Sequence, residues 1–120
     1  MSMSPPPDGR SDTGEITERA LQVIEDQLAD PDLTAAKVAA TVGISRRHLT
    51  RRLKATVGQP PATLLRARRI ERAKRKLWAD PDTIADVAEA VGFRSSSHFS
   101  QVFRKHVGCT PSTYLEKHRS

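Results

Sequence analysis

The 120-residue sequence contains a single cysteine, Cys109. One thiol cannot form an internal disulfide, so a disulfide-built extracellular fold is excluded and a reducing compartment is expected. No apolar run approaches the roughly 20 residues that cross a bilayer, and the first residues lack the basic patch and apolar stretch of a signal peptide. We therefore expect a cytoplasmic protein without a membrane partner.

The sequence also lacks the usual signatures of catalysis. Ser95-Ser96-Ser97 does not match the glycine-flanked serine of a nucleophile elbow, and no glycine-rich phosphate loop occurs. His48 and His98 occupy equivalent positions of the internal repeat described below, which places them in different units and argues against a shared metal site. They are better explained as phosphate-binding or packing residues. We expect no enzyme activity, no catalytic residue, no metal and no cofactor.

Acidic residues are scarce after residue 30. Residues 1–30 carry seven acids and two bases, a net charge of −5. Since the whole chain carries +6, residues 31–120 carry +11. The positive charges of residues 31–120 repel one another unless a polyanion binds them. The basic residues also fall on particular helix faces, which favours a binding surface. This pattern predicts double-stranded DNA as the partner and association with the nucleoid.

One pattern occurs twice along the chain. Val38-Ala39 and Val87-Ala88 open two copies 49 residues apart, and after one inserted residue the match continues at an offset of 50. The second part pairs Ser45 with Ser95, His48 with His98, Val57-Gly58 with Val107-Gly108, and Pro61 with Pro111. A helix, a glycine turn and a second helix that starts at a serine are the parts of a helix-turn-helix unit.

The periodicity predicts an all-α fold of about seven helices. Valine and isoleucine are too scattered for strands, and glycines stand at the expected turns. We expect helices over residues 15–28, 35–41, 46–56 and 61–78, then one capped by Thr83, one capped by Ser95, and a short last one opened by Thr110-Pro111. The expected parts are a disordered arm or linker (1–13), a first helix-turn-helix subdomain (14–59), a linker helix (60–79) and a second such subdomain (80–120).

The third helix has an apolar face and a basic face. Leu49, Leu53 and Val57 repeat every four residues and must face the core. The opposite side carries Arg47, Thr50, Arg51 and Lys54. Helix-turn-helix proteins touch base edges near the start of this helix, and arginine can hold guanine O6 and N7 with two hydrogen bonds. We expect base contacts from Arg46, Arg47 and Arg51, and phosphate contacts from Ser45 and the amides of the first turn.

The sixth helix repeats the plan with weaker charge. Phe99, Phe103 and Val107 are expected inside, and Ser96, Ser97, Ser100, Gln101 and Arg104 outside. Short serines reach a base only at close approach or through water. We therefore expect weaker base reading here and phosphate contacts from Ser95, His98, Arg104, Lys105 and His106.

The long fourth helix is expected to touch both units. Its apolar side comprises Leu64, Leu65, Ala67, Ile70, Ala73 and Leu77, and its polar side carries seven cations against one acid, Glu71. Part of this charge is expected to meet the DNA backbone and part to be solvated. Trp78, near the helix end, is expected to be a packing anchor.

The second repeat resembles a family signature. The residues that match this signature are Ile84-Ala85-Asp86-Val87-Ala88, Val91-Gly92-Phe93, Ser95, Ser97-His98-Phe99-Ser100, Phe103-Arg104-Lys105, Gly108, Thr110-Pro111 and Tyr114. They resemble the AraC/XylS-type transcription regulators, and the likeness covers about residues 15–118. It implies two helix-turn-helix subdomains joined by one long helix, with recognition helices in successive major-groove segments. By position it implies base reading by Arg46, Arg47, Thr50, Arg51, Ser96, Ser97, Ser100 and Gln101. Independently of the resemblance, the basic face of the third helix is expected to meet phosphates, with Lys54 as a phosphate contact.

Three functions remain open from the sequence. The leading one is a sequence-specific bacterial transcription regulator, or the DNA-binding end of a longer one, that binds DNA as a monomer and has RNA polymerase as a further partner. The second is an architectural or weakly specific DNA-binding protein. The third is a helical protein-interaction module. Arginines at the groove-entering turn favour the first. Arg94 stands where many relatives of the family carry a small polar or acidic residue, and the sequence assigns it no role.

Overall fold

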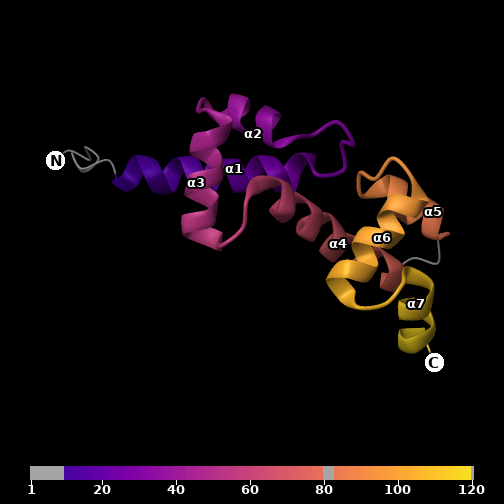
Figure 1. Ribbon diagram of the computed structural model, residues 1–120. Helices are drawn as coiled ribbons and strands as arrows, with labels where there is room; N and C mark the ends of the chain where they lie inside the picture. The colour runs from indigo at the N-terminus through magenta and orange to yellow at the C-terminus, as the bar shows by residue number, and fades with distance from the viewer. Residues whose placement is uncertain (1–9, 80–82, 120) are drawn as a thin grey trace.

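The computed structural model describes residues 10–79 and 83–119, and all regular structure within them is helical. Its elements are α1 (Arg10–Gln27), α2 (Ala35–Val42), α3 (Arg46–Val57), α4 (Pro61–Ala79), α5 (Ile84–Ala90), α6 (Ser96–Val107) and α7 (Pro111–Arg119), as Figure 1 shows. The all-α prediction is confirmed. None of the helices in these two ranges is long and apolar enough to cross a membrane.

The first helix begins earlier than the sequence indicated. The predicted start was residue 15, but α1 begins at Arg10 and ends at Gln27. Residues 10–13, assigned to the disordered arm, are therefore helical. Helix continues there because residues 10–13 include no proline, the strongest helix breaker, and side-chain propensity alone does not stop a helix that packing has already nucleated. The rest of the predicted arm, residues 1–9, lies outside the described residues.

Serine and threonine caps define the helix starts, as predicted. The Ser45 hydroxyl oxygen accepts from the His48 amide at 3.0 Å, and the Ser95 hydroxyl oxygen accepts from the His98 amide at 3.1 Å. Thr34 and Thr83 do the same for α2 and α5, at 3.2 and 3.1 Å. These caps satisfy amides that lack an intrahelical acceptor, so the two units start their helices in the same way.

The first unit has an aliphatic core. Helices α1, α2 and α3 pack together with the beginning of α4. The buried residues of this core are Ala20, Ile24, Leu28, Leu33, Val38, Ala39, Val42, Leu49, Leu53, Leu64 and Leu65. Every predicted inward position of α3 falls here, with Val57 packed at its edge.

The second unit has an aromatic core. It joins the end of α4 to α5, α6 and α7 and contains all three phenylalanines of the chain. Their rings form a row in which Phe93, Phe99, Phe103 and Tyr114 follow one another at centroid distances of 5.3, 5.6 and 5.5 Å. Such tilted and edge-to-face pairs add to the free energy of burial. Val102 is also buried, although the predicted stripe did not include it.

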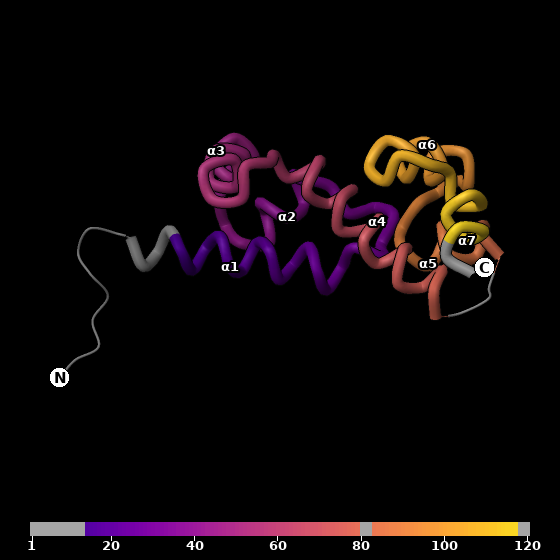
Figure 2. The backbone as a smooth tube through the Cα atoms, turned by 90° about the horizontal axis from the view of Figure 1, so that it is seen from below, coloured from indigo at the N-terminus to yellow at the C-terminus, as the bar shows by residue number. Residues whose placement is uncertain are grey.

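Helix α4 belongs to both cores. Leu64 and Leu65 pack in the first, whereas Ile70, Ala73 and Leu77 pack in the second. A continuous helix with buried residues toward both ends cannot bend cheaply, so it fixes the distance between the units. Figure 2 shows the consequence: α3 and α6 both lie along the upper edge of the molecule, and α1 runs on the opposite side.

Candidate nucleic-acid interface

Helix α3 presents its basic side to solvent. Leu49 and Leu53 are completely buried, whereas Arg47, Arg51 and Lys54 are exposed. The helix contains no acid, so its outward face has no internal counter-charge. The predicted division into an apolar and a basic face is therefore present in the structure. An exposed cationic helix face of this kind is complementary to the phosphates and guanine edges of a major groove.

Thr50, predicted to read bases, has part of its hydrogen-bonding capacity used within the helix. Its hydroxyl donates to the carbonyl oxygen of Arg46 at 3.0 Å, and the side chain is half-buried. A threonine in this arrangement offers a methyl group and an acceptor, not a donor. Its chemistry therefore suits contact with the methyl group of thymine better than a donated hydrogen bond.

Helix α6 presents a polar and less charged side. Ser96, Ser97, Gln101 and Arg104 are exposed and Ser100 is half-buried. Phe99 and Phe103 are completely buried beneath them. The inward and outward positions follow the prediction, and the cations Arg104 and Lys105 lie only in the last turn.

The first residues of the two recognition helices lie at an edge of the interface. Arg46 borders a hollow beside Thr34, Ala35 and Ala36 at the start of α2. The equivalent Ser96 borders a hollow beside Ala85 of α5. Both residues therefore lie beside the preceding helix of their own unit, and the hollow at Arg46 also reaches Arg66 and His98.

The residues predicted to hold phosphates lie at both ends of these helices. Ser45 and Ser95 accept from the helix amides, and their hydroxyl protons can still donate to a phosphate oxygen. Lys54, Arg104 and Lys105 are exposed toward the C-terminal ends. His98 is exposed and meets the Phe93 ring edge-on, with centroids 5.5 Å apart.

The two equivalent histidines have different surroundings. The His48 Nε2 accepts a hydrogen bond from the Arg52 Nε at 3.1 Å, and this contact orients an arginine of the same helix. His98 instead lies on the α4 side of α6, beside Thr63 and Arg66. The repeat preserves the position but not the contact.

Arg69 is one of the seven cations that the sequence placed on the polar side of α4, and that placement is wrong. The structure buries it, with 8% of its surface exposed. Its Nε donates to the Leu28 carbonyl at 2.7 Å, and a terminal nitrogen donates to the Asp30 carbonyl at 2.8 Å. The guanidinium also lies 5.8 Å from the centroid of the Phe93 ring. Burial lowers the pKa of Arg69, and the Asp30 charge opposes that shift.

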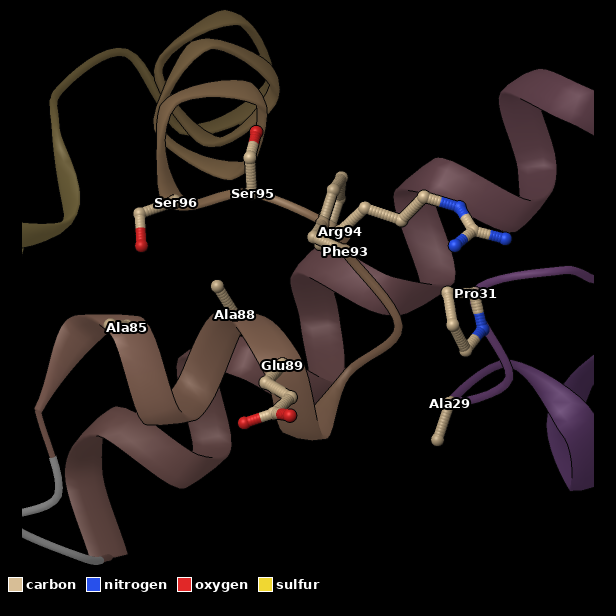
Figure 3. Close-up of a pocket in the computed structure, with 9 residues that line it drawn as sticks. All are labelled: Ala29, Pro31, Ala85, Ala88, Glu89, Phe93, Arg94, Ser95 and Ser96. Carbon is tan, nitrogen blue, oxygen red and sulfur yellow. The ribbon is translucent and has the colours of Figure 1, made fainter.

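Further contacts close the same junction between the units. Arg94, left without a role by the sequence, forms an ion pair with Asp32, and Figure 3 shows it reaching from the turn before α6 toward Pro31. Gly92 has a φ of +95°, and a Cβ there would lie 2.3 Å from the Leu28 carbonyl oxygen. Gly92 therefore permits both a left-handed turn and the close approach of the two units.

The expectation for Trp78 was also wrong. Its side chain is 61% exposed, and its indole nitrogen donates to the Tyr114 hydroxyl at 2.9 Å. The end of α4 directs this residue along the surface of α7, where the hydrogen bond to Tyr114 orients the ring without burying it. No sequence period distinguishes such a position from a buried one.

These features define the class of the protein. Two capped helix-turn-helix units share one rigid helix and direct two polar recognition helices to the same side of the molecule. The family model described as a helix-turn-helix domain matches residues 38–117, which run from within α2 into α7 and so contain both recognition helices. The chain belongs to the AraC/XylS family of transcription regulators and corresponds to the family's DNA-binding domain.

Known proteins agree with this assignment. The transcriptional activator NphR of a Rhodococcus species is 39% identical over 100 residues, which cover 83% of this chain and 30% of NphR. The C-terminal domain of the response regulator AraT from Geobacillus stearothermophilus is 32% identical, with a TM-score of 0.83 over 85% of this chain and 84% of that domain. The DNA-binding domain of AdpA, solved with a target DNA, is 26% identical, with a TM-score of 0.81 over 86% and 92% of the two chains. The chain thus spans less than a third of NphR.

Proposed function

We propose that this domain binds double-stranded DNA in a sequence-specific manner and reads two adjacent major-groove segments as a monomer. The observation that carries the proposal is the common orientation of α3 and α6, which Figure 2 shows on one side of the molecule. The shared helix α4 holds both units, so a single chain supplies two recognition helices. The solved complex of AdpA with its target DNA supports duplex DNA as the partner.

Base reading is proposed to be unequal between the units. In α3, Arg47 and Arg51 have long, exposed side chains that can each donate two hydrogen bonds to a guanine. Thr50 offers a methyl group for contact with thymine. In α6, the candidates are Ser97, Ser100 and Gln101, which are shorter or uncharged. Arg46 and Ser96 are the first residues of their helices and are proposed to read bases from there.

Phosphate contacts are proposed to hold the domain in register. Ser45 and Ser95 lie at the helix N-termini, where free amides and the helix dipole favour an anion. Lys54, His98, Arg104 and Lys105 supply charge around the two recognition faces. Contacts of this type give affinity and salt dependence but little sequence preference.

The role of the whole regulator follows from its relatives and is proposed on that basis. NphR is a transcriptional activator and AraT is a response regulator. We infer that this domain brings a bacterial regulator to promoters in the nucleoid, where RNA polymerase is its further partner. No catalytic residue, metal or cofactor enters this role.

The stoichiometry of a purified complex tests the proposal. A duplex chosen by the domain from a random library should bind one chain, as measured by analytical ultracentrifugation. Its affinity should exceed that for unrelated DNA by about three orders of magnitude or more at physiological salt. A specificity ratio near unity would support the architectural alternative, and two chains on a palindromic site would contradict the monomeric reading.

A further inference from the structure

Arg66 of α4 lies between the two recognition surfaces. It borders a hollow whose other wall is α6, formed by His98, Gln101 and Lys105. The same side chain borders a second hollow that reaches Arg46 at the start of α3. One half-buried cation is thus adjacent to candidate DNA contacts of both units.

Arg66 differs from Arg68, Arg72 and Lys74 of the same helix, each of which has an acidic partner. Glu25 of α1 forms ion pairs with Arg72 at 2.8 Å and Arg68 at 3.6 Å, and Glu71 forms one with Lys74 at 3.4 Å. Over residues 14–79 and 83–117, whose side chains the structure describes, no carboxylate forms an ion pair with Arg66.

The positive charge of Arg66 is electrostatically unfavourable in these surroundings. The titratable groups that line its two hollows are Arg46, Arg69, His98, Lys105 and His106, and none of them is an acid. Clustered like charges lined by low-dielectric walls concentrate a positive potential, which an anion would relieve.

The internal repeat indicates that this charge is not required by the fold. Arg66 corresponds, at the offset of 50, to Glu116 of α7. The equivalent position of the second unit, at the outer end of the molecule, therefore carries the opposite charge. A positive charge occurs only at the position that lies between the units.

The phosphates of bound DNA are the anions that such a position would meet. When two recognition helices enter successive major-groove segments on one face, the minor groove between them faces the protein with a phosphate backbone on each side. We propose that Arg66 binds the backbone phosphates bordering this central minor groove, assisted by His98. The assignment rests on the proposed function and adds a contact that neither recognition helix makes.

The test compares two arginines of the same helix. Arg75 is nine residues after Arg66 and hence about two and a half turns away, on the opposite side of α4. It borders a hollow with Glu25, Arg68 and Glu71, away from α3 and α6. Arg75→Ala is therefore the matched control for Arg66→Ala, and Arg66→Lys retains the charge.

The measurement is the dissociation constant for the selected duplex as a function of salt. Arg66→Ala should weaken binding about tenfold and reduce the salt slope by about 0.9, as for the loss of one phosphate contact. Arg66→Lys should keep the slope, and Arg75→Ala should change affinity by less than about twofold. Equal effects of Arg66→Ala and Arg75→Ala would overturn the assignment.

Neutral phosphates test the contact without altering the fold. Methylphosphonates placed at the backbone positions of the central minor groove should weaken wild-type binding and have little further effect on Arg66→Ala. If the two losses simply add, Arg66 acts by packing and the assignment fails, although the proposed function stands. If the wild-type chain prefers no duplex at all, the proposed function fails and this contact fails with it.

Discussion

The Arg69 guanidinium donates a 2.7 Å hydrogen bond to the main-chain carbonyl of Leu28, just beyond the end of α1. Helix α1 has no basic residue in its last turn, and its final carbonyls carry the negative end of the helix dipole. Arg69 supplies the missing cation from α4. Because the Arg69 side chain also lies against Phe93 of the second unit, this one residue connects α4 to both units.

Loss of Arg69 should destabilise the whole domain. Arg69→Ala removes two charge-assisted hydrogen bonds at a buried site and should lower the free energy of unfolding by roughly 2–4 kcal/mol. The control, Arg68→Ala, breaks one 3.6 Å ion pair that is largely exposed and should cost less than about 0.5 kcal/mol. Urea unfolding followed by circular dichroism measures both. Similar losses in the two variants would show that the Arg69 contacts are unimportant.

The two turn glycines should respond differently to alanine. Gly43 and Gly92 both have positive φ, at +83° and +95°, so each alanine variant should lose about 1 kcal/mol through backbone strain. A Cβ at Gly43 meets nothing within 4 Å, whereas one at Gly92 meets the Leu28 carbonyl and Arg69. Gly92→Ala should therefore lose at least twice as much stability. Thermal unfolding of the two variants compares them, and equal losses would contradict the close approach described here.

The helices and recognition faces were predictable because they depend on local pattern. Ser45, Ser95, Gly58 and Gly108 mark the ends of α3 and α6, and residues three and four apart along the sequence lie on the same side. The family resemblance follows from the same residues. Position along the chain is therefore sufficient to tell the exposed side of α3 and α6 from the buried side.

The junction between the units was not predictable in this way. Arg69 looks like any other arginine on a basic helix, and its acceptors are main-chain carbonyls 39 and 41 residues away. Main-chain groups leave no mark in a side-chain pattern. Gly92 gave a partial signal, since its repeat position fixed the turn, but its contact with Leu28 depends on how the two units meet. The hydrogen bond from the Thr50 hydroxyl to the Arg46 carbonyl was also missed, although a signal for it existed, since threonine often bonds back within a helix.

Exposed arginines of α3 and α6 should have separable effects on DNA binding. Arg47→Ala or Arg51→Ala should cost about 1–3 kcal/mol and relax preference at particular base pairs. Arg104→Ala should weaken all sequences about equally and lower the salt slope. Binding to a panel of single-base variants of the selected site measures this. If Arg104→Ala changed base preference while both α3 variants did not, the roles of the two faces would be reversed.

The serines of α6 should contribute less specificity than one arginine of α3. A hydroxyl both donates and accepts, so it distinguishes bases poorly, whereas a forked guanidinium selects guanine. Replacing Ser96, Ser97 and Ser100 together by alanine should therefore reduce specificity less than Arg47→Ala does. Selection experiments with each variant give the information content at every position. A larger loss from the triple variant would refute the ranking.

The most direct test of two rigidly held recognition helices is the spacing of their sites. Selection from a random library should give an asymmetric site about two turns long, with a strong guanine-containing half and a more degenerate half whose centres lie about 34 Å apart. Five base pairs are then inserted between the halves, which turns one half to the far side of the duplex. Affinity should then fall to the level of the stronger half alone, and unchanged binding to the lengthened site would contradict a rigid connection between α3 and α6.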